Sequence, residues 1–136
     1  MRLFLTAAAL TLTLAAAASA GTCQQNFTVA GLPLLSQIEY RTAGGVKGVD
    51  SATAMKRIAS ALRADGGYYN IKVTKRSVTA SQETSGSGRP QGIRFDAAPA
   101  GNLLRIDAVF VIQQGQLASE RIVRRELCRL IGVAQG

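Results

Sequence analysis

Hydrophobic and polar side chains alternate through residues 102–112, and this period of two predicts a β-strand. One phase of the pattern is apolar throughout: Leu104, Ile106, Ala108, Phe110 and Ile112. The other phase begins with Arg105 and Asp107 and then becomes apolar at Val109 and Val111. Because a strand that is apolar on both phases needs cover on both faces, we expect a central strand whose far end lies under other elements.

A helix is predicted to follow, from about Ala118 to Ile131. Helical spacing gathers its apolar side chains on one face: Val123, Leu127, Leu130 and Ile131. The opposite face carries arginines at every fourth position: Arg121, Arg125 and Arg129. Gly132 is expected just beyond the helix, where glycine is favoured.

A second amphipathic helix is predicted from Asp50 or Ser51, either of which can cap it, to about Ala64. Its inner face holds the large apolar residues Met55, Ile58 and Leu62. Its outer face is polar and mostly basic: Lys56, Arg57, Ser60 and Arg63.

Three further strands are predicted at residues 37–42, 68–79 and 93–97, the second of them with a bulge near Lys75. Between these elements we expect an irregular lead-in at 21–35 and loops at 44–48 and 81–92, the last one mobile. The order is strand, helix, three strands and helix. It predicts an α+β fold, with a mostly antiparallel sheet of about four strands and two helices packed on it.

Residues 1–20 have the pattern of a cleaved bacterial export signal. Arg2 precedes an apolar run that is short for a membrane span, and Ala18-Ser19-Ala20 matches a cleavage site. The mature chain would then be one domain at 21–136, periplasmic or secreted, with no membrane-spanning stretch. Loss of Arg2 leaves 15 of the 16 basic residues against 8 acidic ones, a formal charge of +7.

The chain has two cysteines, Cys23 and Cys128, one near each end of the mature domain. In an oxidising compartment we expect a disulfide that ties the start of the domain to its last helix. Two separate thiols or an intermolecular bridge are the alternatives. The wide spacing does not fit a redox pair such as C-x-x-C.

Several kinds of catalysis are excluded by composition, because the chain contains no histidine. This excludes histidine-assisted nucleophiles and histidine zinc sites, and no phosphate-binding P-loop motif is present. Asp96 and Asp107 could form an acid–base pair across neighbouring strands, but Arg94 and Arg105 beside them favour cross-strand ion pairs instead. We therefore expect no metal, no cofactor and no enzymatic activity.

Residues 125–133, with the sequence RELCRLIGV, resemble the H-E-x-x-H active-site helix of zincin metallopeptidases. Glu126 matches the general base of that family, whereas Arg125 and Arg129 stand where the two histidine ligands would be. Because arginine cannot ligate zinc, the resemblance implies a degenerate, metal-free relative that has lost the activity.

The feature that points toward a function is the excess of basic over acidic residues. The binding candidates lie on the last helix and on one strand: Arg121, Arg124, Arg125, Arg129, Lys72 and Arg76. Such charge attracts an anionic partner: a lipid head group, an acidic glycan or an acidic protein. The small number of aromatic residues does not favour nucleic acid.

The main hypothesis is therefore a non-catalytic exported binding domain, with no oligomeric state specified. A small hydrolase that uses carboxylates such as Glu126, or a structural accessory protein without a ligand, is the alternative.

Overall fold

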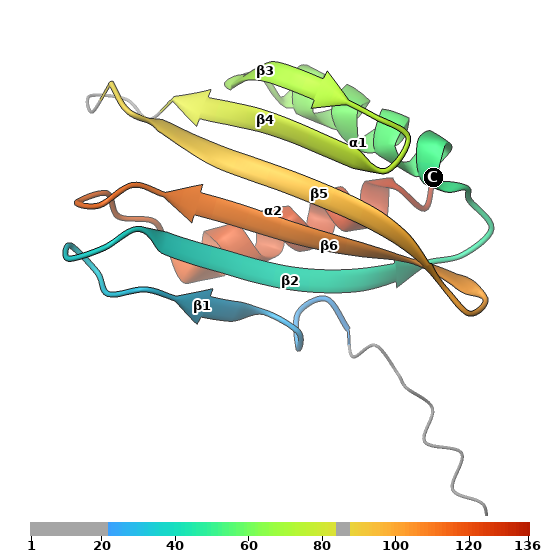
Figure 1. The fold of residues 1–136 in the computed structure, drawn as a ribbon, viewed down its shortest axis with the longest axis horizontal. Helices are drawn as coiled ribbons and strands as arrows, with labels where there is room; N and C mark the ends of the chain where they lie inside the picture. The colour runs from blue at the N-terminus through green and yellow to red at the C-terminus, as the bar shows by residue number, and fades with distance from the viewer. Residues whose placement is uncertain (1–21, 84–87) are drawn as a thin grey trace, which may run out of the picture.

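The computed structural model describes residues 22–83 and 88–136, and in these it forms one antiparallel sheet of six strands with two helices (Figure 1). The strands are β1 Thr28–Ala30, β2 Ile38–Val46, β3 Tyr68–Val73, β4 Ser77–Glu83, β5 Pro90–Ala100 and β6 Leu103–Ile112. The helices are α1 Ser51–Asp65 and α2 Glu120–Val133. The strand order is β1-β2-β6-β5-β4-β3, so the α+β fold and the antiparallel sheet are confirmed.

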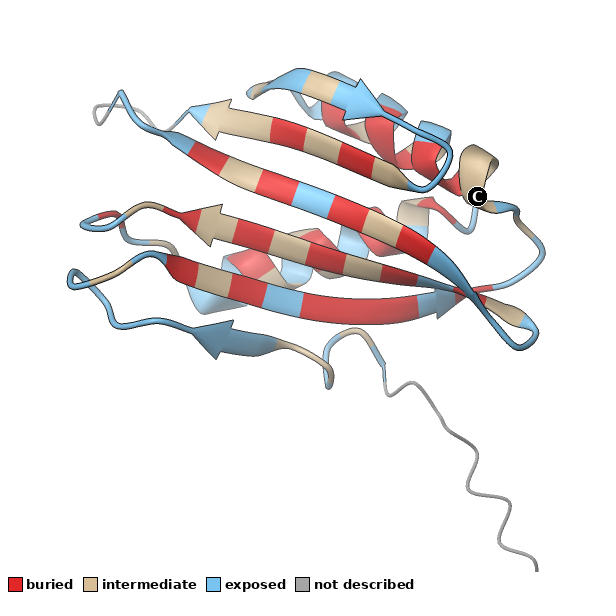
Figure 2. Cartoon of the chain, viewed as in Figure 1, coloured by how far each residue is buried: buried red, intermediate tan, exposed pale blue. Residues whose placement is uncertain are grey.

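The core lies between one face of the sheet and the two helices, which both cover that face (Figure 1). Buried and more exposed residues alternate along the central strands (Figure 2). α1 packs on β3, β4 and β5, whereas α2 packs on β2 and β6. The largest fully buried side chains come from both layers: Phe95, Met55, Ile58, Leu62, Ile106, Ile112, Leu127, Leu130 and Val78.

The cover that was expected on both faces of the last strand is absent from the described part of the chain. Val109 and Val111 lie on the face away from the helices and are half-buried. Val109 has Arg41 and Arg94 as its cross-strand neighbours. Because long arginine stems can cover apolar surface, partial burial arises there without a second layer.

The sheet has more strands than the sequence predicted. Residues 68–79 form a hairpin rather than one bulged strand, because Thr74 closes a tight turn. The Thr74 hydroxyl accepts hydrogen bonds from the backbone N–H groups of Arg76 (3.2 Å) and Ser77 (3.0 Å). The predicted irregular lead-in contains β1, which pairs with the edge of β2.

The predicted loop at 44–48 begins later than expected, because β2 continues through Gly44 and Gly45 to Val46. A Cβ atom added at Gly44 would lie 3.0 Å from a methyl carbon of Ile131 and 3.6 Å from Cβ of Cys23. Glycine here therefore lets α2 and the disulfide approach the strand closely. In the predicted loop at 81–92, β4 extends to Glu83 and β5 starts at Pro90, and residues 84–87 lie outside the described residues.

The helix positions agree closely with the sequence pattern. Asp50 is the N-cap of α1 and accepts a hydrogen bond from the backbone N–H of Thr53 (3.4 Å). The expected end of α2 was wrong, since Gly132 lies inside the helix. Tertiary contacts hold the residues just beyond it: Arg57 donates to the carbonyl of Ala134 (3.1 Å), and the backbone N–H of Lys47 donates to the Gln135 side chain (2.8 Å).

Cys23 and Cys128 form the expected disulfide, with their Cα atoms 5.6 Å apart. The bond joins the segment before β1 to α2, and both cysteines are half-buried. The Thr42 hydroxyl adds a hydrogen bond to the carbonyl of Cys23 (2.5 Å). The predicted export signal at 1–20 lies outside the described residues. In the part that is described, neither helix has the length and apolar character needed to cross a bilayer.

Candidate binding sites

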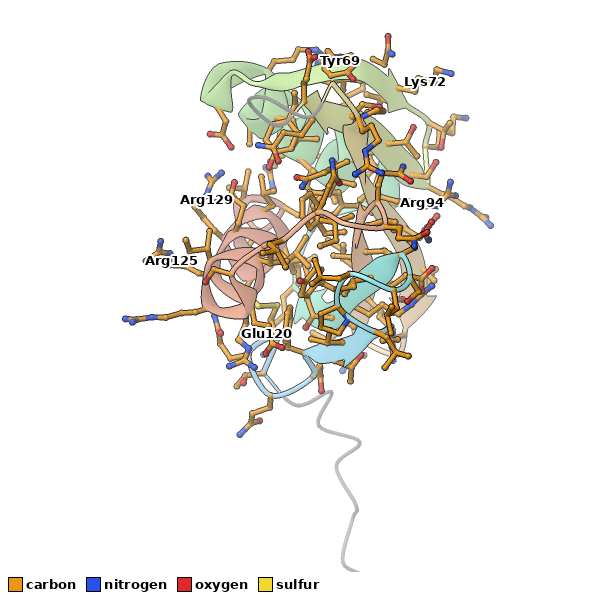
Figure 3. The ribbon with its side chains drawn as sticks, turned by 90° about the vertical axis from the view of Figure 1, so that its left-hand side faces the viewer. Tyr69, Lys72, Arg94, Glu120, Arg125 and Arg129 are labelled. Carbon is orange, nitrogen blue, oxygen red and sulfur yellow. A yellow bond between two sulfur atoms is a disulfide. The ribbon has the colours of Figure 1, made fainter. Side chains whose placement is uncertain are left out.

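The arginines of α2 have different environments, although the sequence grouped them together. Arg121 and Arg125 are exposed, and neither forms a salt bridge with any described residue. Figure 3 shows Arg125 pointing away from the sheet. These two side chains are therefore available to solvent.

Arg129 is held by two carboxylates. It donates to both oxygens of Glu126, from Nε at 3.0 Å and from a terminal nitrogen at 2.7 Å, and it also pairs with Asp65 on α1. The hydrogen bonds to Glu126 are the main cause that raises the pKa of Arg129, and the same contact lowers the pKa of Glu126. A carboxylate held in this way is a weaker proton acceptor, which disfavours a general-base role for Glu126.

Arg124 packs within the structure rather than facing outward. Its guanidinium lies over the ring of Phe27, 4.7 Å from the ring centroid, and Phe27 stacks on Tyr40. Its Nε atom is buried and has no hydrogen-bond partner among the described residues. A cation–π contact of this kind stabilises the attachment of the first segment to α2.

Lys72 and Arg76 lie on the β3–β4 hairpin, distant in the fold from the arginines of α2. Lys72 pairs in register with Thr79, and Figure 3 shows it on the opposite side of the molecule from Arg125 and Arg129. The structure therefore does not bring the six predicted binding residues into one site.

A basic groove lies between α1 and the β3–β4 hairpin, with a volume of about 590 Å³. We call it the α1–β3 groove. Lys56 and Arg63 line it from the helix and Lys75 from the hairpin turn, together with Ser60 and Thr74. No carboxylate lines it, and no described carboxylate pairs with any of the three cations.

The sequence predicted one side of this groove but not the other. The basic outer face of the first helix was visible as a periodic pattern. The approach of Lys75 was not, because it depends on the hairpin turn. The Ser51 hydroxyl fixes that turn by donating to the carbonyl of Lys75 (2.5 Å).

A second cavity, of about 620 Å³, lies between α2 and the helix-facing side of the sheet. We call it the α2 pocket. Tyr68, Gln82 and Gln91 line it from β3, β4 and β5, and Asp65, Glu126 and Arg129 also line it. The sequence did not predict this pocket, because Gln82 and Gln91 fall in the segment expected to be a mobile loop.

Tyr68 is strongly affected by this environment. Burial, reinforced by the negative charges of Glu126 and Asp65, raises the pKa of Tyr68 from 10.0 to about 12. The folded protein therefore retains the phenolic proton over a pH range in which the unfolded chain loses it. By linkage, the stability from this group is present below pH 10 and is lost as the pH rises from about 10 to about 12.

Burial also raises the pKa of Tyr40, so we expect Tyr68→Phe to remove one tyrosine equivalent from the late part of an alkaline absorbance titration, near pH 12. The same titration in denaturant is the control, and there the late step should be missing. A late step of undiminished amplitude in the Tyr68→Phe variant would contradict the assignment.

Asp96 and Asp107 are cross-strand neighbours on the uncovered face. Each binds the arginine two residues before it in its own strand: Arg94 Nε lies 2.7 Å from Asp96, and an Arg105 terminal nitrogen lies 3.0 Å from Asp107. The expected ion pairs are present, but they run along the strands rather than across them. Both carboxylates are thus held by arginine, which disfavours an acid–base pair.

In residues 22–83 and 88–136, no three His, Cys, Asp or Glu side chains come together as a metal site would require.

Comparison with known proteins identifies the fold and no more. No protein-family model and no curated protein matches the chain. Among solved structures, the chain is similar to CalU16 from Micromonospora echinospora, with a TM-score of 0.52 and 10% identity over 81% of this chain and 83% of that one. At this identity the similarity concerns the fold alone, and the zincin-like resemblance of residues 125–133 stays a prediction.

Proposed function

We propose that the protein is an exported, non-catalytic binding domain that holds an anionic partner in the α1–β3 groove. Export is supported by the signal-like pattern of residues 1–20 and by the disulfide, since structural disulfides are typical of oxidising compartments. The partner belongs to one of three classes: a lipid head group, an acidic glycan or an acidic protein.

The observation that carries the proposal is the unbalanced charge of this groove. Elsewhere the basic side chains are often neutralised: Arg41, Arg94, Arg105 and Arg129 each bind a carboxylate. Lys56, Arg63 and Lys75 line one concave surface without such a partner. A cleft lined by charge of one sign concentrates its field and attracts ions of the opposite sign.

The lining of the groove also bears on the class of partner. It contains no aromatic side chain. Binding of single-stranded nucleic acid commonly uses aromatic rings on which bases stack, so nucleic acid is not favoured. Lys72 and Arg76 neighbour Val73 and Lys75 of the groove in sequence, and they extend the positive charge along the hairpin.

The test is a triple variant, Lys56→Gln, Arg63→Gln and Lys75→Gln. If each exposed charge contact contributes roughly 0.2–1 kcal/mol, the variant should bind heparin or anionic lipid vesicles about 3- to 150-fold more weakly. Its retention on a heparin column should also depend less on salt, because fewer charge contacts remain to be screened.

A charge-matched control removes three cations elsewhere: Lys47→Gln, Arg121→Gln and Arg125→Gln. Equal losses of binding affinity in the two variants would mean that only the net charge of the protein matters. A larger loss of affinity in the control variant would place the site on α2. Either result would overturn the assignment to the α1–β3 groove. Comparing heparin with vesicles separates a glycan-like from a lipid-like partner.

A further inference from the structure

The α2 pocket contains a row of hydrogen-bonding side chains on the face of the sheet that forms the core. Tyr68 pairs in register with Gln82, and Gln82 with Gln91, so the three side chains are direct neighbours across β3, β4 and β5. The rest of this face is mostly apolar, as expected for the side of a sheet that packs against helices. The polar row is a local departure from this apolar pattern, at the place where the face borders the pocket.

Gln91 is the critical member of the row. The residue as a whole is only 4% exposed, and its side-chain amide forms no hydrogen bond with a described residue, but the amide is not a fully buried polar group, because it is reached from the pocket. A side-chain amide that faces a pocket in this way keeps its donor and acceptor available to water or to a bound molecule. Since Gln91 lines the pocket, a bound molecule could supply the missing partner.

The other surfaces of the pocket indicate the kind of molecule that fits. Its wall is apolar and comes from both layers: Ile93, Phe110, Val123 and Leu127. Two apolar side chains, Leu117 (72% exposed) and Ile122 (56% exposed), form a lip at the start of α2. An apolar wall with a few converging polar groups, at this volume, is typical of a small-molecule site.

The charge of the pocket excludes the anions proposed for the α1–β3 groove. Asp65 and Glu126 contribute two negative charges against the single positive charge of Arg129, which they already bind. An anionic ligand would meet net repulsion here. The α2 pocket thus calls for a ligand of a different class.

We propose that the α2 pocket binds an uncharged, mostly apolar small molecule whose carbonyl or hydroxyl group hydrogen-bonds to the amide of Gln91. The side-chain amide can donate and accept, so either group can pair with it. Gln82 and the Tyr68 hydroxyl provide further partners in the same row. The apolar part of the molecule covers the wall and the lip.

The test uses Nile red, an uncharged apolar dye with a carbonyl group, whose fluorescence rises in apolar surroundings. The wild-type protein should bind it saturably. Gln91→Met, which nearly keeps the side-chain volume, should raise the Kd about 3- to 10-fold through loss of one hydrogen bond. If Gln91→Met does not fold, Gln82→Met provides the same test, because Gln82 is a half-buried member of the same row.

The lip is tested with Leu117→Ser combined with Ile122→Ser, which should raise the Kd about tenfold by removing apolar contact area. Leu34→Ser combined with Leu35→Ser is the matched control, because these exposed leucines lie outside the pocket, and it should leave the Kd unchanged. Absence of saturable binding, or a Kd unaffected by loss of the amide, overturns the proposal. The triple glutamine variant of the α1–β3 groove should bind Nile red normally, so failure of one proposal is distinguishable from failure of the other.

Discussion

Replacing both Cys23 and Cys128 with serine is expected to lower the free energy of unfolding by about 4–5 kcal/mol. The disulfide spans 105 residues of sequence, nearly the whole domain. In the chain-entropy model, closing so long a loop restricts the unfolded chain strongly, and its loss gives that entropy back to the unfolded state. A loss of this size is a large part of the stability of a small domain.

Denaturant unfolding of the double serine variant measures this loss. The wild-type protein in a strong reductant is the control, and it should match the variant because both lack only the bond. The contact of Arg124 with Phe27 should still hold the first segment against α2 in either form. A loss below about 1 kcal/mol would show that the bond does little to restrict the unfolded chain.

The second large effect is expected at Phe95, where Phe95→Ala should cost about 3–5 kcal/mol. This side chain is fully buried between the sheet and the helices, with Val78 and Ala108 as its cross-strand neighbours. Truncation removes apolar contacts and leaves a cavity that the surrounding structure can fill only in part.

Leu35→Ala is the control for Phe95→Ala, because Leu35 is 72% exposed and its truncation should change the stability by no more than about 0.5 kcal/mol. Both changes are measured by the same denaturant unfolding. Similar losses in the two variants would contradict the position of the core. The comparison therefore tests which face of β5 the helices cover.

The sequence by itself determined those features whose cause is local or periodic. The two helices were found because apolar residues recur at helical spacing, and the cap of the first was narrowed to Asp50 or Ser51, of which the structure shows Asp50. The alternation in residues 103–112 located β6 for the same reason. The disulfide followed from the number of cysteines and the expected compartment.

Only the tertiary structure decided how many strands form and where they end. Gly44 and Gly45 look like a loop in sequence, but Ile131 of α2 lies close to Gly44 and Leu103 of β6 lies close to Gly45, which favours residues without a side chain in that strand. The hairpin at Thr74 depends on hydrogen bonds made by one hydroxyl, and β1 depends on an edge that β2 supplies. The Thr74 hydrogen bonds are local but do not alter the alternating pattern of the sequence, whereas the glycine strand and β1 arise from contacts between distant residues, which a local pattern does not contain.

The same physical reason separates the predicted binding residues from the sites in the structure. Arg124 and Arg129 look alike in sequence, but Phe27 packs against one, and Asp65 and Glu126 bind the other. Lys75 joins Lys56 and Arg63 only when the hairpin packs beside α1, and Gln91 comes to line a pocket only when α2 packs beside the sheet. The types of residue are written in the chain, but the neighbours of each side chain, and hence which charges and amides remain free, depend on how the elements pack.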